Sequence, residues 1–234
     1  MPARKEAPAQ RVPLNRDRVL RAAIAIADGS GIDVVSMRRV ADDLGVVPMA
    51  LYKHVANKEE LLDGMVEIVI GEIDPPMAKV DWKPAVRQRI LSARRLMLRH
   101  PWARGVLETR TSPTPTALAY MDSFIGTLLA GGLTVDLTHH VMHAIGSRMF
   151  GFSQELFGGD GSPAAEAPPA ALDQIAQQYP HIAVIVARAA HDEASVVGSG
   201  CDDQFEFEFS LDLLLDGFER LHRQGWTSLA PDVE

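Results

Sequence analysis

Basic and aromatic residues are concentrated in one short segment of the chain, MRRVADDLGVVPMALYKHV, at residues 37–55. In a helical register, the side chains that face away from the local core are Arg38, Arg39, Tyr52, Lys53 and His54. Arginine and lysine bind phosphates, arginine also forms paired hydrogen bonds with a guanine edge, and tyrosine and histidine donate to phosphate oxygens. These residue types predict an interface with DNA.

The apolar residues of the same segment have the spacing of a helix-turn-helix. This motif needs a small residue where its helices cross, a glycine in the turn and an apolar anchor on the second helix. Ala41, Gly45 and Leu51 stand at these positions. The alternative is a helix pair in an unrelated bundle, but that alternative leaves a cationic, aromatic face on an acidic protein unexplained.

Helices are expected on both sides of the motif. Apolar residues at 19, 22, 23, 26 and 27 follow one helix face, and Gly29 and Gly31 end that helix. Ser36 is an N-cap for the next helix, and Pro48 suits the first turn of a third. Asn57 with Glu60 forms a capping box for a fourth helix, which runs to the Asp74-Pro75-Pro76 break.

The rest of the chain is also predicted to be helical, so the fold class is all-α. Longer helices are expected at 82–100, from Ser112-Pro113 to Gly131, from Thr134 or Asp136 to about 157, and at 202–224, with shorter ones at 171–178 and 181–195. Residues 205–209 alternate like a strand, but no partner strand is evident and helical spacing is favoured. Residues 158–170, GGDGSPAAEAPPA, are predicted to be a mobile loop.

Composition limits the function and the compartment. Net charge is −8, yet residues 1–60 contain 10 basic and 8 acidic side chains, whereas residues 61–234 contain 13 and 23. A non-specific architectural DNA protein needs a broadly basic surface, so this class is disfavoured. Cys201 is the single cysteine, and neither a secretory signal nor an apolar run of membrane-spanning length is present. We therefore expect a cytoplasmic protein without a membrane partner.

Residues 15–70 resemble the TetR family of repressors. The resemblance rests on Gly31-Ile32, Ser36 to Ala41, Leu44 to Val46, Leu51 to Val55 and Asn57 to Leu62. It implies a recognition helix that begins near Pro48. The positions that it matches to DNA contacts are Arg38, Pro48, Met49, Ala50, Tyr52, Lys53, His54 and Lys58.

The resemblance extends into the C-terminal domain of the tetracycline-repressor type. It is carried there by Thr109-Arg110, Gly131 to Leu133, Gly146 and residues 205–219, FEFEFSLDLLLDGFE. It implies a homodimer in which the long helix and the last helix of each subunit form a four-helix interface. Gly146 and Gly151 would allow close helix approach, and the apolar area would come from Leu211, Leu214, Leu215 and Phe218. Such a dimer binds a palindrome.

The resemblance also implies a ligand pocket among the helices at 82–100, 114–130 and 136–157. The residues that it assigns to the pocket are Arg110, Phe124, His143 and Ser147. Val106 replaces the histidine that holds the ligand's magnesium in tetracycline-binding members, and Arg89 replaces a ligand-binding asparagine. We therefore expect a small, largely apolar inducer other than tetracycline-magnesium, and no cofactor.

The chain is then divided into a flexible arm (1–13), a helix-turn-helix domain (14–60) and a helical ligand-binding and dimerisation domain (61–234). Arg4, Lys5 and Arg11 of the arm either contact the DNA backbone or belong to a solvated tail, which is the favoured interpretation. The predicted function is a repressor that a small inducer releases from its operator, through movement of the helix at 58–70.

Histidines supply the main alternative. His139 and His143 are four residues apart on one helix face, a spacing that suits zinc in a metal-dependent enzyme or a metal-sensing regulator. A third ligand cannot be identified, and the glutamate of the zinc-protease helix is absent, so no metal site is predicted. Polar pocket or interface histidines are favoured. His100 is interpreted as a residue at a helix C-terminus that interacts with the helix dipole, rather than as a catalytic base.

Other features have less specific interpretations. Met97, Met121, Met142 and Met149 fit an ordinary core better than a plastic pocket, and Cys201 fits an unactivated thiol better than an oxidation sensor. No nucleophile elbow, phosphate-binding glycine loop or dinucleotide fingerprint occurs, which disfavours an enzyme.

Overall fold

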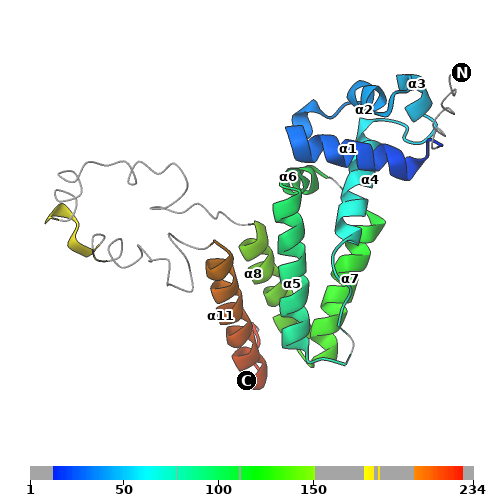
Figure 1. Ribbon diagram of the computed structural model, residues 1–234. Coiled ribbons are helices and arrows are strands. Elements are labelled where there is room, and N and C mark those ends of the chain that lie inside the picture. Colours follow the sequence, from blue (N-terminus) through cyan, green and yellow to red (C-terminus); the bar gives the residue numbers. More distant parts are fainter. Residues whose placement is uncertain are drawn as a thin grey trace, which may run out of the picture. The chain divides into compact units, whose positions relative to one another are not determined.

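The computed structural model describes residues 13–77, 79–110, 112–150, 177–181, 184 and 203–228. Predictions for residues 1–12, the loop at 158–170, most of the two short helices after it, Gly151 and Cys201 lie outside this part of the chain. In the described part every regular element is a helix, which confirms the all-α prediction (Figure 1). None of the described helices combines the length and the apolarity that crossing a bilayer requires.

The chain divides into two compact units, which are described separately. Residues 1–79 and 88–127 form the first unit, and residues 80–87 and 128–234 form the second. Helices α5 (Trp82–Arg99) and α7 (Pro115–Ala130) contribute residues to both units. The remaining helices of the first unit are α1 (Arg16–Ser30), the 3-10 turn η1 (Ile32–Val34), α2 (Met37–Leu44), α3 (Pro48–Leu51), α4 (Lys58–Gly71) and α6 (Trp102–Thr109).

Local capping fixes the starts of the helices around the motif, as predicted. The Ser36 side chain accepts from the Arg39 amide at 3.1 Å, and Asn57 accepts from the Glu60 amide at 2.8 Å. Glu60 completes the capping box by accepting from the Ala56 amide at 2.7 Å. Gly45 ends α2 with φ 65° and ψ 36°, a left-handed conformation that favours glycine. The turn between α2 and α3 is therefore encoded locally.

The first unit has one apolar core that extends from the helix-turn-helix into the helices below it. Leu20 on α1, Leu51 on α3, Leu61 and Met65 on α4 are completely or almost completely buried in it. Trp102 and Val106 of α6 belong to the same cluster. Val106, at the position where the resemblance implied a magnesium-binding histidine, is thus a core residue.

Two segments of the first unit differ from the prediction. The stretch after Pro101 forms helix α6, with Pro101 at its N-cap position, whereas no helix was predicted between residue 100 and Ser112. Helix α7 begins at Pro115 instead of at Ser112-Pro113, because the Thr114 side chain accepts from the Ala117 amide at 3.3 Å. In both cases the helix begins at a local N-terminal signal that periodicity alone does not reveal.

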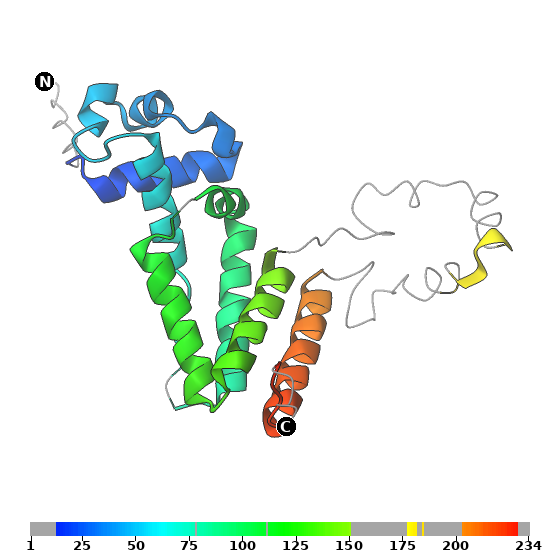
Figure 2. The same cartoon turned by 180° about the vertical axis from the view of Figure 1, so that it is seen from behind.

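The second unit is built on α8 (Val135–Phe150) and α11 (Asp203–Arg223), which lie side by side in Figures 1 and 2. Thr134 caps α8 by accepting from the Leu137 amide at 3.1 Å. The core contains Leu137, Val141 and Ile145 from α8, and Phe207, Leu211, Leu215 and Phe218 from α11. The expectation that Leu211, Leu215 and Phe218 supply a dimer interface is therefore wrong, since the subunit's own core already buries them.

Ion pairs join the first turns of α5 to α11 within this unit. Lys83 donates to Asp216 at 2.5 Å and to Glu219 at 2.8 Å, and Arg87 donates to Asp212 at 2.6 Å and to Glu208 at 2.7 Å. The hydrogen bonds that Lys83 donates to Asp216 and Glu219 raise the pKa of Lys83, and the bond to Lys83 lowers the pKa of Glu219. The pairs align the two helices, although such exposed pairs contribute little free energy.

The close approach of Gly131 to Trp82 gives a test of packing in the second unit. A Cβ at position 131 would lie 2.4 Å from Trp82 Cβ and 2.5 Å from Cγ, so Gly131→Ala would force backbone to move. We expect a loss of about 1–3 kcal/mol in unfolding free energy, measured by urea denaturation. Gly126→Ala on α7, where a Cβ meets nothing within 4 Å, is the control and is expected to gain up to about 1 kcal/mol. Equal effects of the two substitutions would contradict this packing.

Candidate nucleic-acid interface

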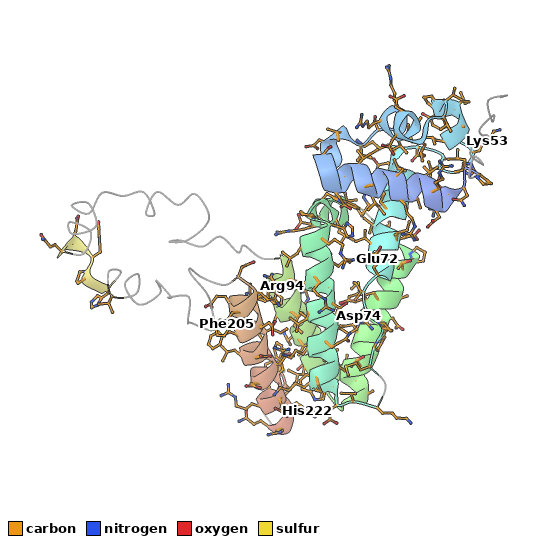
Figure 3. The ribbon with its side chains drawn as sticks, in the orientation of Figure 1. Lys53, Glu72, Asp74, Arg94, Phe205 and His222 are labelled. Carbon is orange, nitrogen blue, oxygen red and sulfur yellow. The ribbon has the colours of Figure 1, made fainter. Side chains whose placement is uncertain are left out.

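The structure places the residues predicted to bind DNA on the accessible surface of the helix-turn-helix. Seven of them are exposed, namely Arg38, Arg39, Pro48, Met49, Tyr52, Lys53 and Lys58, and Ala50 and His54 are half-buried. In Figure 3 the Lys53 side chain lies at the outer edge of the helix-turn-helix. One further residue joins this surface, since Val47, directly before α3, is 68 % exposed. Val47 was not among the residues predicted to bind DNA, although its place before Pro48 at the start of the predicted recognition helix was a signal.

The cations of this surface have no protein partner. In the part of the chain that the structure describes, Arg38, Arg39, Lys53 and Lys58 form neither ion pairs nor side-chain hydrogen bonds. Arginines of the neighbouring helices behave differently, because Arg95, Arg99, Arg104 and Arg110 each pair with a carboxylate. An external anion that binds the helix-turn-helix therefore breaks no existing ion pair.

A part-buried contact with a carboxylate joins α1 to the junction of α5 and α6. Asp28 Oδ1 lies 2.7 Å from His100 Nδ1 and accepts from Trp102 Nε1 at 2.6 Å. His100 is 5 % exposed and Trp102 is 7 % exposed. On its other side, His100 Nε2 lies 3.9 Å from a carboxylate oxygen of Glu72, at the end of α4. His100 thus contacts Asp28 of another helix, while its Nε2 has no hydrogen-bond partner, and it directly follows the C-terminus of α5 as predicted.

Arg110 makes a second connection, between the end of α6 and α4. Its Nη1 donates to Glu59 at 2.7 Å and to Asp63 at 3.1 Å, and its side chain is 14 % exposed. Burial acts to lower the pKa of Arg110, but the hydrogen bonds to Asp63 and Glu59 outweigh it and raise the pKa. The sequence placed Arg110 in a ligand pocket. Its ion pairs with the helix that follows the recognition helix were not foreseen.

The other three residues assigned to the pocket lie on two different helices. Phe124 on α7 is 4 % exposed in the first unit, with its ring 6.3 Å from that of Tyr120. His143 and Ser147 are exposed on α8 in the second unit. Their common role in ligand binding stays a prediction.

The histidine cluster on α8 lacks the ligand set of a metal site in the described residues. The rings of His139 and His143 are 4.5 Å apart, while His140 lies 3.6 Å from Asp136 and packs against Trp226. No group of three or more potential metal ligands occurs in residues 13–150 or 203–228 where the structure describes them. The described structure therefore adds no third ligand to the His139–His143 pair.

Comparison with known proteins agrees with this geometry. The model of the bacterial regulatory proteins, tetR family, matches residues 19–65, and that of the tetracyclin repressor-like C-terminal domain matches residues 75–222. The HTH-type transcriptional repressor DrrR1 of Streptomyces coeruleorubidus is 31% identical over 233 residues, which cover 93% of this chain and 82% of that protein. This chain belongs to the TetR family.

Further TetR-family relatives show how far the similarity extends. An HTH-type transcriptional regulator of Saccharopolyspora erythraea is 33% identical over 120 residues, 51% of either chain. The solved structure of ActR from Streptomyces coelicolor in complex with actinorhodin is 25% identical, with a TM-score of 0.61, and the match covers 89% of this chain and 98% of that one. The chain is thus a ligand-responsive DNA-binding repressor, as the sequence predicted.

Removing the shared acceptor at Asp28 tests the connection between α1 and α6. Asp28→Ala leaves the buried N–H groups of Trp102 and His100 without an acceptor, so we expect a loss of about 1–3 kcal/mol in unfolding free energy. Glu108→Ala, which removes the carboxylate of an exposed pair with Arg104, is the matched control and should cost about 0.5 kcal/mol or less. Urea denaturation measures both. An Asp28 variant as stable as the control would show that the contact contributes nothing.

Proposed function

We propose that this TetR-family repressor binds a palindromic operator as a homodimer through the residues from Arg38 to Lys58, and that a small-molecule inducer releases it. The observation that supports the assignment of the interface is the group of exposed, unpaired cations around a capped recognition helix. Because they lie on one rigid motif, their spacing is preserved when the protein approaches a duplex. Its site of action would be the cytoplasm, where the operator lies.

Different residues of the surface suit different parts of DNA. Arg38 has the fork geometry that binds guanine O6 and N7, while Tyr52, His54 and Lys58 suit phosphates. Met49, which is 72 % exposed, and its neighbour Val47 offer only apolar contact, which fits a thymine methyl group. Lys53 suits a further phosphate, and Arg39, Pro48 and Ala50 complete the proposed interface.

The exposed apolar side of α11 is the proposed dimer interface. Phe205, Phe209 and Leu213 recur every four residues and are 42%, 53% and 58% exposed. Figure 3 labels Phe205 at the start of α11, and the rings of Phe205 and Phe209 stack 6.4 Å apart. On α8, Gly146 has no atom within 4 Å of the place where a Cβ would stand, which leaves room for a helix of a second subunit. A two-fold pairing of these faces would place two recognition helices in successive major grooves, roughly 34–36 Å apart.

The contacts of α6 suggest how an inducer would act on the recognition helix. At its start, His100 and Trp102 bind Asp28 on α1, and after its end Arg110 binds Glu59 and Asp63 on α4. A ligand that displaces α6 would therefore change the forces on the two helices that pack against the motif. The proposed ligand contacts remain Arg110, Phe124, His143 and Ser147. Driving the population from 1:99 to 99:1 requires a preference of about 5.5 kcal/mol for the non-binding form.

The salt dependence of operator affinity tests the DNA interface. With 3–4 phosphate contacts per subunit, the slope of log K against log salt concentration should be about −5 to −7. Lys53→Met removes one phosphate contact from each subunit, so the slope should become less negative by about 2. Fluorescence anisotropy on a palindromic fragment, selected from genomic DNA by the protein itself, measures this slope.

Arg104→Met is the matched control for this measurement. It removes the same charge from an exposed arginine on α6, outside the helix-turn-helix, and should leave the slope unchanged. A Lys53 variant with an unaltered slope would exclude Lys53 from the interface, and equal binding of any DNA sequence would contradict the proposal as a whole.

Phe209→Glu tests the proposed dimer interface. It places a charge in the apolar row of α11, so light scattering should report a monomer and operator affinity should fall at least tenfold, because a single half-site remains. Leu118→Glu on α7, where the leucine is 52% exposed, controls for the introduced charge and should leave the dimer intact. A dimeric Phe209 variant would place the interface elsewhere.

A further inference from the structure

Arg89, on α5 in the first unit, is buried without a counter-charge. The residue is 4% exposed, and one nitrogen, Nη2, donates to Ser123 Oγ at 3.1 Å. Its other two nitrogens, Nε and Nη1, are shielded from solvent and have no hydrogen-bond partner. Among the described residues, no carboxylate pairs with this guanidinium.

A buried guanidinium without a counter-charge destabilises the protein when no ligand is bound. A guanidinium keeps its charge at any physiological pH, so burial cannot be relieved by losing a proton. An unpaired buried charge is among the costliest features of a protein interior. Asp74, one of the acids that contact α5, is already occupied, because its carboxylate accepts from Gln88 at 3.1 Å and from Arg95 at 2.8 Å.

An aromatic side chain of α7, Tyr120, lies against the guanidinium. Its Cζ lies 4.6 Å from the centre of the Tyr120 ring, and that ring packs against the buried Phe124. Burial raises the pKa of Tyr120, and this effect outweighs that of the neighbouring Arg89 charge, which lowers it. The guanidinium therefore offers the three N–H groups of Nε and Nη1, which have no acceptor, and a full positive charge beside an aromatic side chain.

We propose that Arg89 is the binding group for an acidic inducer, one that joins an anionic group to an aromatic or apolar body. This inference rests on the proposed function, and it narrows the inducer from a largely apolar molecule to an organic anion. The anion accepts from Nε and Nη1 and supplies the missing counter-charge, while the body packs on Tyr120 and Phe124. A neutral molecule of the same shape leaves the charge uncompensated and binds more weakly.

A matched pair of fluorescent probes tests the charge preference. 8-Anilinonaphthalene-1-sulfonate and N-phenyl-1-naphthylamine share one ring system and differ in the sulfonate. Fluorescence titration of the full-length protein should give a higher affinity for the sulfonate. In Arg89→Met, affinity for the sulfonate should fall about tenfold or more, since hydrogen bonds to a charged group are lost, while affinity for the neutral probe should change less than about twofold. Arg89→Lys keeps the charge but loses the planar, forked guanidinium. Its affinity for the sulfonate should lie between those of the wild type and of Arg89→Met.

Controls separate this result from unfolding and from other binding surfaces. Arg104→Met removes an exposed charge and should leave both affinities unchanged. Arg89→Met should keep the helical circular dichroism signal and unfold at the wild-type temperature or above it, because it removes an unpaired buried charge. Apolar surfaces bind both probes about equally, because such binding does not depend on the sulfonate. The ratio of the two probe affinities therefore reports the preference for the sulfonate.

Two results would overturn the proposal. The first is an equal loss of affinity for both probes in Arg89→Met. The second is a preference for the sulfonate that is as strong in Arg89→Met as in the wild type. Operator binding of wild type and of Arg89→Met is measured in parallel by anisotropy. A wild-type protein without operator binding would contradict the proposed function, whereas the probe ratio decides the role of Arg89 independently.

Discussion

The recognition helix depends on burial that it cannot provide for itself. Helix α3 has four residues and α2 has eight, and helices this short are not stable in isolation. Their positions are held by Leu51, Val40 and Ala41, which are fully buried against the apolar residues of α1 and α4. The exposed cations keep a fixed arrangement only because this shared core is intact.

Because the recognition helix depends on this shared core, the binding of a ligand elsewhere in the core can affect the DNA-binding surface. The core of the helix-turn-helix is continuous with Trp102 and Val106 of α6, so movement of α6 changes the packing of α1 and α4. The Asp28 and Arg110 contacts reinforce the apolar contact at either end of α6 with directional hydrogen bonds. Packed interiors respond to such shifts by changing between discrete arrangements rather than by deforming continuously.

Local signals made much of the first unit predictable from sequence. Ser36, Gly45, Pro48 and the Asn57–Glu60 capping box act on neighbouring residues, so their effects are visible in the order of amino acids. The Asp28–His100 contact joins residues 72 positions apart, and nothing local distinguishes it. Helix α11 shows a different limit. Its apolar residues surround much of the helix, and periodicity does not say which of them meets α8 and which, such as Phe209 and Leu213, stays exposed.

The distribution of charge separates groups that stabilise the fold from groups kept for binding. Arg87 and Arg110 meet carboxylates from other helices, so their charges are compensated when the protein is alone. The cations of the helix-turn-helix are unpaired but solvated, which costs little. Arg89 is unpaired and buried, which is costly, and selection for stability alone would favour an apolar side chain at that position. An anion that binds Arg89 acts in the same unit as the recognition helix, and by linkage it lowers operator affinity by the same factor by which the operator lowers affinity for the anion. Release from DNA then requires that Arg89 bind the anion more tightly in the non-binding form than in the DNA-binding form, because a ligand that compensates the buried charge equally in both forms shifts neither population.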